Sequence, residues 1–164
     1  MEETRQVEVT LHQEAVDASG YAFRVVFDDT AIPELATDES PPLGQGGGPD
    51  PSRLLVAAVA NCLSASLLFA LRKFHNSPGP LSTHATATLA RNAGGRWRVV
   101  HIQAELRLAE AAADHTQLER LLAQFEDFCI VTESVRQGVP VTVAVSDAQG
   151  MRLHGPDPVA ATAA

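Results

Sequence analysis

The feature that most constrains the fold of this chain is one apolar run, "LLVAAVANCLSASLLFAL", at 54–71. Asp50 precedes it as a helix N-cap, Pro51 suits the first helical position, and "HNSPGP" follows and stops the run. The sequence therefore predicts a helix over 51–74. Because apolar residues occupy nearly every side of this helix, other parts of the protein have to cover most of its surface.

The run is of marginal length for crossing a lipid bilayer. It contains Asn61, Ser64 and Ser66, alanine is frequent where a spanning segment would favour leucine and isoleucine, and strand-like patterns flank it. These features favour a buried core helix, so no membrane partner is expected. One small sheet cannot cover so apolar a helix, and an intimate homodimer that buries it between two subunits would supply the missing surface.

Length and charge narrow the possible functions. A chain of 164 residues can form one domain with its own core, which we place at 1–154, with a disordered tail at 155–164. The net charge of −8 argues against nucleic acid or an anionic membrane as partner, since both attract basic surfaces. The N-terminal sequence lacks the basic and apolar regions of a signal peptide, which indicates a cytoplasmic protein.

Two pairs of segments with alternating apolar and polar residues predict two β-hairpins, one on each side of the helix. The four strands are expected at 7–15, 21–27, 81–91 and 96–108. In the last strand, the alternation places Val100 and Ile102 on one face and Val99 and His101 on the other. The Pro- and Gly-rich segment 28–50 is interpreted either as a functional loop or as a plain surface loop.

A second helix is expected to open at Thr116, where Glu119 completes a capping-box pattern. Apolar residues at helical spacing continue from Leu118 to Cys129, a short helical turn then reaches Gly138, and "VPVTVAV" at 139–145 predicts a closing strand. The predicted order is β-β-α-β-β-α-α-β, which corresponds to an α+β fold.

The two cysteines, Cys62 and Cys129, lie on the core-facing stripes of the two predicted helices. If those helices pack together, the two sulfur atoms can meet and react as a pair. The alternative is inert packing, because free cysteine is among the most buried residue types. Two cysteines without CxxC or HExxH spacing cannot complete a structural zinc site, and the six histidines are scattered, so no metal site is expected.

A reactive thiol has to be ionised, and burial raises the pKa of a thiol unless a cation or a helix N-terminus compensates. Cys62 lies in the middle of its helix, where the helix dipole has little effect. An arginine would then have to approach it. Arg53 projects from the wrong face of the helix, which leaves Arg24, Arg72 and Arg136 as candidates.

Two segments, "GPDPSRLLVAAVANCLSASL" and "FEDFCIVTESVRQGVPVTVAV", resemble the two signature regions of the OsmC/Ohr superfamily, which includes the osmotically inducible protein C and the organic hydroperoxide resistance proteins. The first signature is a Gly/Pro-rich loop followed by an alanine-rich helix that ends in Ala-x-Cys-Leu. The second is a Cys-Pro-x-Ser step, a short helix and a Gly-Val-Pro-Val strand. The element order agrees with this family from about residue 7 to residue 145.

The resemblance implies a swapped homodimer with the long helices at its centre, and thiol peroxidase chemistry without a cofactor. Carried over by position, Cys62 is the peroxidatic residue, whose thiolate attacks the O–O bond of an organic or fatty-acid hydroperoxide and becomes a sulfenic acid. Cys129 is then the resolving residue, which forms with Cys62 a disulfide that a dithiol reductant reduces.

The chain departs from the family pattern at several positions. Ser52 stands where the family has a glutamate that orients the thiolate-stabilising arginine, and the loop that carries this arginine has no match here. In the second signature Ile130 replaces proline and Thr132 replaces serine. Glu126 is either a substitute carboxylate or a solvated helix residue. These departures keep a second function open, in which the fold binds an apolar small molecule or has a redox-linked role without efficient peroxidase turnover.

Overall fold

The computed structural model describes residues 3–14, 20–138, 145–146 and 152–154. Its elements, in chain order, are β1 (Val9–Gln13), β2 (Phe23–Phe27), β3 (Leu35–Thr37), α1 (Pro51–Lys73), β4 (Ser82–Arg91), β5 (Trp97–Arg107), η1 (Ala112–Asp114), α2 (Leu118–Leu122), η2 (Phe125–Phe128), α3 (Ile130–Gln137), β6 (Val145–Ser146) and β7 (Arg152–His154). Separate antiparallel sheets beside a long helix confirm the predicted α+β class. Most of the strand predicted at 139–145, and the whole tail at 155–164, lie outside the described residues.

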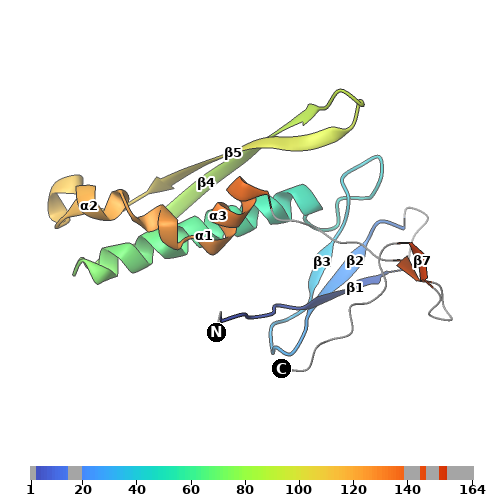
Figure 1. Cartoon of the computed structure of the whole chain (residues 1–164), viewed down its shortest axis with the longest axis horizontal. Coiled ribbons are helices and arrows are strands. Elements are labelled where there is room, and N and C mark those ends of the chain that lie inside the picture. Colours follow the sequence, from blue (N-terminus) through green and yellow to red (C-terminus); the bar gives the residue numbers. More distant parts are fainter. Residues whose placement is uncertain (1–2, 15–19, 139–144, 147–151, 155–164) are drawn as a thin grey trace.

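The long helix α1 forms where the sequence predicts it. The Asp50 side chain caps its N-terminus by accepting the Arg53 amide at 2.9 Å, and Pro51 is the first helical residue. At the other end, the Phe74 amide donates to the Ala70 carbonyl as the helix closes. Figure 1 shows α1 as the axis along which most of the other elements are arranged.

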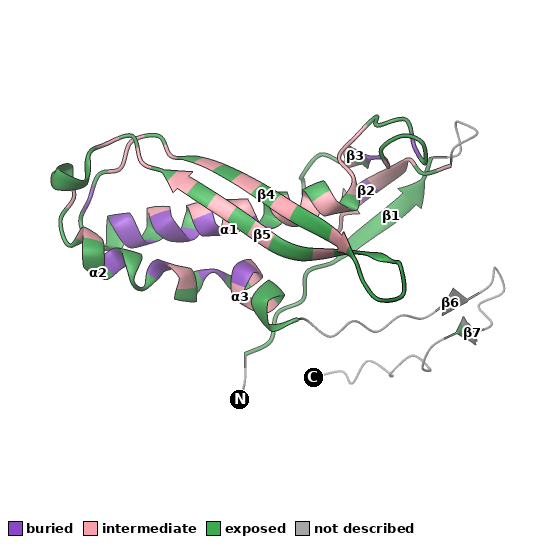
Figure 2. Ribbon diagram, turned by 90° about the horizontal axis from the view of Figure 1, so that it is seen from above, coloured by how far each residue is buried: buried purple, intermediate pink, exposed green. Residues whose placement is uncertain are grey.

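Two groups of elements cover α1 from different sides. The β4–β5 hairpin lies along one side, and α2, η2 and α3 lie along another (Figure 1 and Figure 2). Strands β1, β2 and β3 form a separate antiparallel sheet beyond the N-terminal end of α1, with β2 in the middle. In that sheet Val25 of β2 pairs with Leu11 of β1 and with Leu35 of β3.

The core is a stripe of α1 side chains packed against the second helical segment, and Figure 2 shows it as the buried side of α1. The α1 members recur every three or four residues, as expected for one face of a helix. This spacing brings the second cysteine into the same cluster as the middle of α1. The buried members are Val59, Leu63, Leu67, Ala70, Leu71, Leu121, Phe125 and Cys129.

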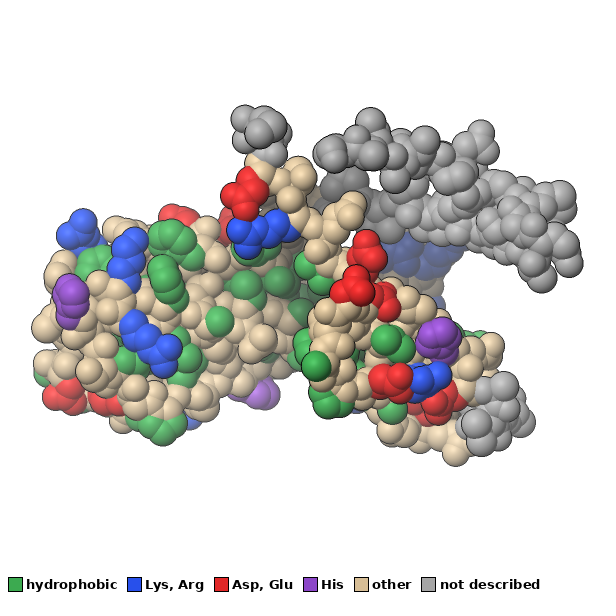
Figure 3. All heavy atoms as spheres, turned by 90° about the horizontal axis from the view of Figure 1, so that it is seen from below, with side chains coloured by type: hydrophobic (Ala, Val, Ile, Leu, Met, Phe, Trp, Pro, Cys, Tyr) green, Lys and Arg blue, Asp and Glu red, His purple; other side chains and the backbone are tan. Residues whose placement is uncertain are grey.

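Among the described residues, no comparable cluster covers the opposite side of α1. By length and composition α1 is the one helix in the described part of the chain that is apolar enough to cross a membrane, a test that core helices also pass. Only 33% of its most apolar window is buried. We call Ala58, Asn61, Ala65, Phe69 and Arg72 the open face of α1, since all are exposed. Figure 3 shows hydrophobic side chains spread over the surface that faces away from the hairpin.

The predicted second helix differs from what the structure contains. The Thr116 hydroxyl donates to the Phe74 carbonyl at 3.1 Å and does not cap α2, so the capping-box prediction is wrong. After Leu122 the chain continues as the separate turns η2 and α3, so the prediction of one helix as far as Cys129 is also wrong. The expected short helix up to Gly138 is confirmed, because α3 ends there.

A bulge interrupts the alternation in β5. Thr88 pairs with His101 and the next residue, Leu89, pairs with Val99, so Val100 is the extra residue. Val100 is 58% exposed and Val99 is half-buried, the reverse of the predicted faces for these two residues. The predicted alternation is confirmed on the C-terminal side of the bulge.

The segment predicted as a long loop contains a third strand, β3, which pairs with β2. Beyond it the chain is organised by one buried side chain, Asp38. Its carboxylate accepts the amides of Gln45 at 2.9 Å and Gly47 at 3.1 Å. The loop before α1 therefore has a defined conformation, which brings Asp50 to the N-terminus of the helix.

Candidate active site

The structure brings the two cysteines together. Cys62 lies in the middle of α1, and Cys129 directly precedes α3 as its N-cap residue. Both are free thiols, and Cys62 packs against the buried cluster that contains Cys129. Cys129 is fully buried, whereas Cys62 is partly exposed. We call these two residues the thiol pair, of which one sulfur is accessible and the other is hidden.

Two hydroxyl groups and the first turn of α3 surround the thiol pair. The Cys129 thiol donates to Thr132 Oγ1 at 2.9 Å in a buried contact. Ser66, one turn beyond Cys62 on α1, is buried, and its hydroxyl favours the ionised form of Cys129. The backbone amides of Val131 and Thr132 favour the ionised form of Cys62. None of these partners is a charged side chain.

This environment shifts the pKa values of the two thiols in opposite directions. Burial raises the pKa of the Cys62 thiol, and the contact with Cys129 raises it further, while the two amides act in the other direction. Burial also opposes the ionisation of Cys129. However, hydrogen bonds from the Cys62 thiol and from the hydroxyls of Thr132 and Ser66 outweigh burial and lower the pKa of Cys129. Cys129 is therefore the more acidic thiol of the pair.

The other polar residues that the sequence analysis related to the ionisation of Cys62 lie on different elements. Arg24 of β2 is held by Glu34 at 2.7 Å. Ser52 and Arg72 lie near opposite ends of α1, each about 15 Å from Cys62 along the axis at 1.5 Å per residue. Neither Ser52 nor Arg72 is therefore a direct neighbour of the thiol pair.

Arg136 of α3 lies closer to the site but is already engaged. Its guanidinium forms ion pairs with Glu126 of η2 and with Glu133 of α3. These carboxylates raise the pKa of Arg136, with the Glu126 hydrogen bond as the main cause. Glu126 thus binds an arginine, as a substitute carboxylate would, although the pair is partly solvated and the arginine is not among the contacts of the thiols described above.

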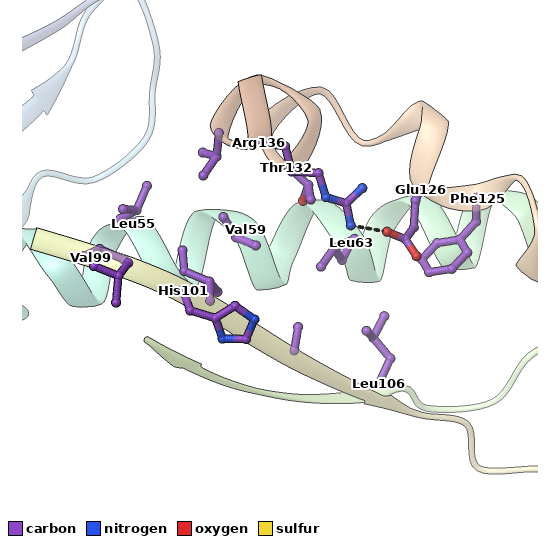
Figure 4. A pocket seen from close by; sticks show the side chains of 14 residues that line it. Leu55, Val59, Leu63, Val99, His101, Leu106, Phe125, Glu126, Thr132 and Arg136 are labelled. Carbon is purple, nitrogen blue, oxygen red and sulfur yellow. Dashed lines mark hydrogen bonds and ion pairs between the residues drawn. The ribbon is translucent and has the colours of Figure 1, made fainter. Parts of the chain in front are cut away.

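A cavity of about 620 Å³ adjoins the site between α1, β5, η2 and α3. Its walls are mostly apolar, and Glu126 and Arg136 form one polar edge (Figure 4). Thr132 lines the cavity and also contacts Cys129, so it stands between the cavity and the thiol pair. The two sulfur atoms are not part of the lining.

Metal ligands do not gather at this site. Within the described ranges, no group of three or more His, Cys, Asp and Glu side chains is placed to hold a metal ion.

Comparison with known proteins identifies the family. The family described as OsmC-like protein matches residues 44–144, which is more than half of the chain and includes both cysteines. The chain belongs to the OsmC-like protein family. No protein of curated function matches it.

Solved structures of OsmC-like proteins share the fold. One is an OsmC-like protein from Vibrio cholerae, with 20% identity over 81% of this chain and 94% of that one, and a TM-score of 0.61. Another is an organic hydroperoxide resistance protein OsmC from Legionella pneumophila, with 16% identity over 82% and 92% and a TM-score of 0.63. A third is an organic hydroperoxide resistance protein from Elizabethkingia anophelis, with 15% identity over 84% and 93% and a TM-score of 0.61.

The sequence of this OsmC-like protein identifies Ser66 as a polar residue of the apolar run and Thr132 as a departure from the second signature, but it does not place their hydroxyls beside Cys129. Ser66 lies one helical turn after Cys62, and Thr132 lies at the third position after the N-cap Cys129. A Cys-x-x-Thr spacing at a helix start is the signal that would have found Thr132, because an N-cap side chain faces the third helical residue. The predicted continuous helix concealed that signal.

Proposed function

We propose that this OsmC-like protein is a cysteine-based thiol peroxidase that reduces organic hydroperoxides. The contact between Cys62 and Cys129 carries the proposal, because it joins an accessible thiol to a buried one that can form a disulfide with it. Membership of the family supports this chemistry, since two proteins of the same fold are named organic hydroperoxide resistance proteins.

In the proposed reaction the Cys62 thiolate attacks the terminal oxygen of the peroxide. An S–O bond forms, the O–O bond breaks, and the alkoxide leaves and is protonated to an alcohol. Cys129 then attacks the sulfenic acid on Cys62, which gives a disulfide and water. A dithiol reductant returns both residues to thiols. A cytoplasmic location would favour that reduction.

The experiment mixes the purified protein with cumene hydroperoxide and a dithiol and follows the loss of peroxide. We expect Cys62→Ser to abolish turnover. When peroxide is added before the dithiol, the wild type should form a Cys62–Cys129 disulfide and Cys129→Ser should instead retain a sulfenic acid on Cys62, which mass spectrometry distinguishes. Gln103→Ala, on the exposed side of β5 and outside the cavity lining, is the control and should keep full turnover. Peroxide loss that survives Cys62→Ser would contradict the proposal.

We also propose that two copies form a homodimer through the open face of α1. Phe69 is 54% exposed there, and Ile130 at the start of α3 is 79% exposed. Burial of such side chains stabilises association. Sedimentation velocity should show a dimer that Ala65→Glu converts to monomer, while Gln103→Glu on the exposed side of β5 has no effect. A monomeric wild-type protein at micromolar concentration would exclude the dimer.

The cavity favours a second candidate function, the binding of an apolar small molecule without efficient turnover. Its volume of about 620 Å³ and mostly apolar lining suit a fatty acid or a similar ligand. This function predicts that a fatty acid raises the melting temperature while cumene hydroperoxide is not consumed. Peroxide consumption that requires Cys62 would exclude it as the sole function.

A further inference from the structure

The proposed reaction needs an ionised Cys62, but the surroundings of this residue favour the neutral thiol. Burial and the neighbouring Cys129 both oppose its ionisation. Arg24 and Arg136, which are candidate activating cations from the sequence, are bound by carboxylates. The Cys62 proton therefore needs an acceptor at close range. Cys129 is in direct contact with the Cys62 side chain.

We propose that Cys129 is the base that takes the proton from Cys62, and that the hydroxyls of Ser66 and Thr132 are positioning residues that hold Cys129 as a thiolate. This inference rests on the proposed function and extends it, since it gives Cys129 a task before disulfide formation.

The contacts of Cys129 suit a thiolate. Ser66 approaches from α1 and Thr132 from α3, so the sulfur lies between hydroxyls on two elements. Each of these residues is only 6% exposed and Cys129 is not exposed at all, so water does not compete for the sulfur. In the neutral pair Thr132 Oγ1 accepts from the thiol. A hydroxyl can rotate and donate instead once the thiol has lost its proton.

The contacts of Cys62 suit the opposite role. Cys62 is the partly exposed member of the pair, so a peroxide can reach it and cannot reach Cys129. The amides of Val131 and Thr132, in the first turn of α3, favour negative charge on Cys62. Proton transfer thus moves the charge from a buried sulfur to an accessible one.

The steps balance with the peroxide and the dithiol as the only co-reactants. Cys62 gives its proton to the Cys129 thiolate, and the Cys62 thiolate attacks the terminal peroxide oxygen. The S–O bond forms, the O–O bond breaks, and Cys129 returns the proton to the leaving alkoxide, which becomes an alcohol. The regenerated Cys129 thiolate then attacks the Cys62 sulfur, the S–S bond forms and the S–O bond breaks, and the hydroxide that leaves takes a proton from solvent to become water. The dithiol supplies two electrons to restore the pair.

Charged groups on the surrounding elements are placed away from this exchange. Between Arg53 and Arg72, α1 carries no charged residue. Glu126 binds Arg136, which also binds Glu133, so these charges compensate one another at the edge of the cavity. The remaining titratable residues of the packed elements are all exposed, namely Lys73 at the end of α1, His84 and Arg91 on β4, Arg98, His101, Glu105 and Arg107 on β5, Glu119 and Arg120 on α2, and Asp127 on η2.

The first test titrates the reduced protein without peroxide and follows thiolate absorbance in the ultraviolet. Two coupled thiols ionise in two macroscopic steps. We expect the step at lower pH to persist in Cys62→Ser and to vanish in Cys129→Ser. Thr132→Val keeps the backbone amides, and it should move this step upward by about 1 to 2 pH units, the equivalent of one hydrogen bond to a charged group.

A double variant distinguishes a general structural effect of Thr132→Val from the loss of its hydroxyl contact with Cys129. In the Cys129→Ser background, Thr132→Val should leave the ionisation of Cys62 unchanged, because the lost hydroxyl contacts Cys129. The second test measures the rate at which iodoacetamide alkylates Cys62 as a function of pH, with the site identified by mass spectrometry. The inflection should coincide with the lower wild-type step and move upward by at least 1 pH unit in both Cys129→Ser and Cys129→Ala.

The proposal is overturned if the lower step disappears in Cys62→Ser but remains in Cys129→Ser, or if the alkylation inflection is the same in all variants. Neither measurement uses peroxide. A wild-type protein that passes both tests but leaves cumene hydroperoxide unreduced would refute the proposed function alone. Circular dichroism of each variant establishes that it is folded, and the agreement of the Ser and Ala variants at position 129 guards against a local packing defect.

Discussion

Asn76 and Thr116, far apart in the sequence, exchange hydrogen bonds in both directions. The Thr116 amide donates to Asn76 Oδ1 at 2.7 Å, and Asn76 Nδ2 donates to the Thr116 carbonyl at 3.2 Å. Nδ2 also donates to the Leu71 carbonyl at 3.3 Å, near the C-terminal end of α1. One buried amide thus fixes the end of α1 against the start of α2. The segment that carries Cys129 follows from this junction.

We predict that Asn76→Ala destabilises the protein by about 1 to 3 kcal/mol, because it removes a buried side chain and leaves the partly buried Thr116 amide without its acceptor. Urea unfolding followed by circular dichroism measures the change. Gln103→Ala, at an exposed position of β5 outside the proposed dimer interface, is the control and should stay within about 0.5 kcal/mol of wild type. Equal losses for the two variants would show that the Asn76 junction contributes nothing specific.

The sequence predicted α1 well because every signal agreed there. Asp50 as N-cap, Pro51 at the first position and a long apolar run all act within the helix, and the structure uses each of them. Both cysteines were also found, since each lies on an apolar stripe that faces the core.

The features that the sequence predicted wrongly or did not predict have one physical origin, which is contact with partners remote in sequence. Thr116 could have capped α2, but its hydroxyl meets the Phe74 carbonyl instead. Strand β3 was hidden because its pairing with β2, and not its own short pattern, defines it. The bulge at Val100 depends on β4 in the same way. Local patterns do not contain these contacts, so the hydroxyl at Thr132 was overlooked along with the break before α3.

Asp38 should make stability depend on pH in the acid range. The Gly47 amide lowers the pKa of this carboxyl, together with the Gln45 amide, against the opposing effect of burial. A carboxyl with a lowered folded-state pKa stabilises the fold at every pH above the unfolded-state value of about 3.9. The contribution is lost as the pH falls through the folded-state pKa.

We therefore predict that the urea midpoint of the wild type falls as the pH decreases below about 4, and that Asp38→Asn removes part of this dependence. The variant should also be less stable at pH 7, because a neutral side-chain amide replaces the carboxylate that accepts the backbone amides of Gln45 and Gly47. Unfolding curves between pH 7 and the acid limit measure both effects. Glu8→Gln, an exposed carboxyl before β1, should leave the pH profile unaltered.

Gly138 ends α3 in a left-handed conformation with φ of 69°. An added Cβ would meet no described atom within 4 Å, so backbone strain is the expected cost of a side chain. We predict that Gly138→Ala destabilises by about 1 to 2 kcal/mol. Gly138→Asn should lose less, because Asn tolerates this conformation. Thermal unfolding measures the stabilities, which should decrease in the order wild type, Gly138→Asn, Gly138→Ala. Gly94→Ala is the control and should cause no such loss, because φ of Gly94 is not positive.

The cavity beside the thiol pair can be filled without touching the sulfur atoms. Ala104 of β5 lines it and is partly buried against the core, whereas neither cysteine is part of the lining. If the cavity holds an apolar ligand, Ala104→Phe should weaken the binding of a fluorescent fatty acid at least tenfold, since the ring would occupy that space. Ala90→Phe, on β4 and outside the lining, is the control and should bind like wild type. The rate of Cys62 alkylation should be the same in all three proteins, because the filled space and the reacting thiol are separate. A fatty acid that binds the Ala104→Phe variant unchanged would show that it occupies another surface.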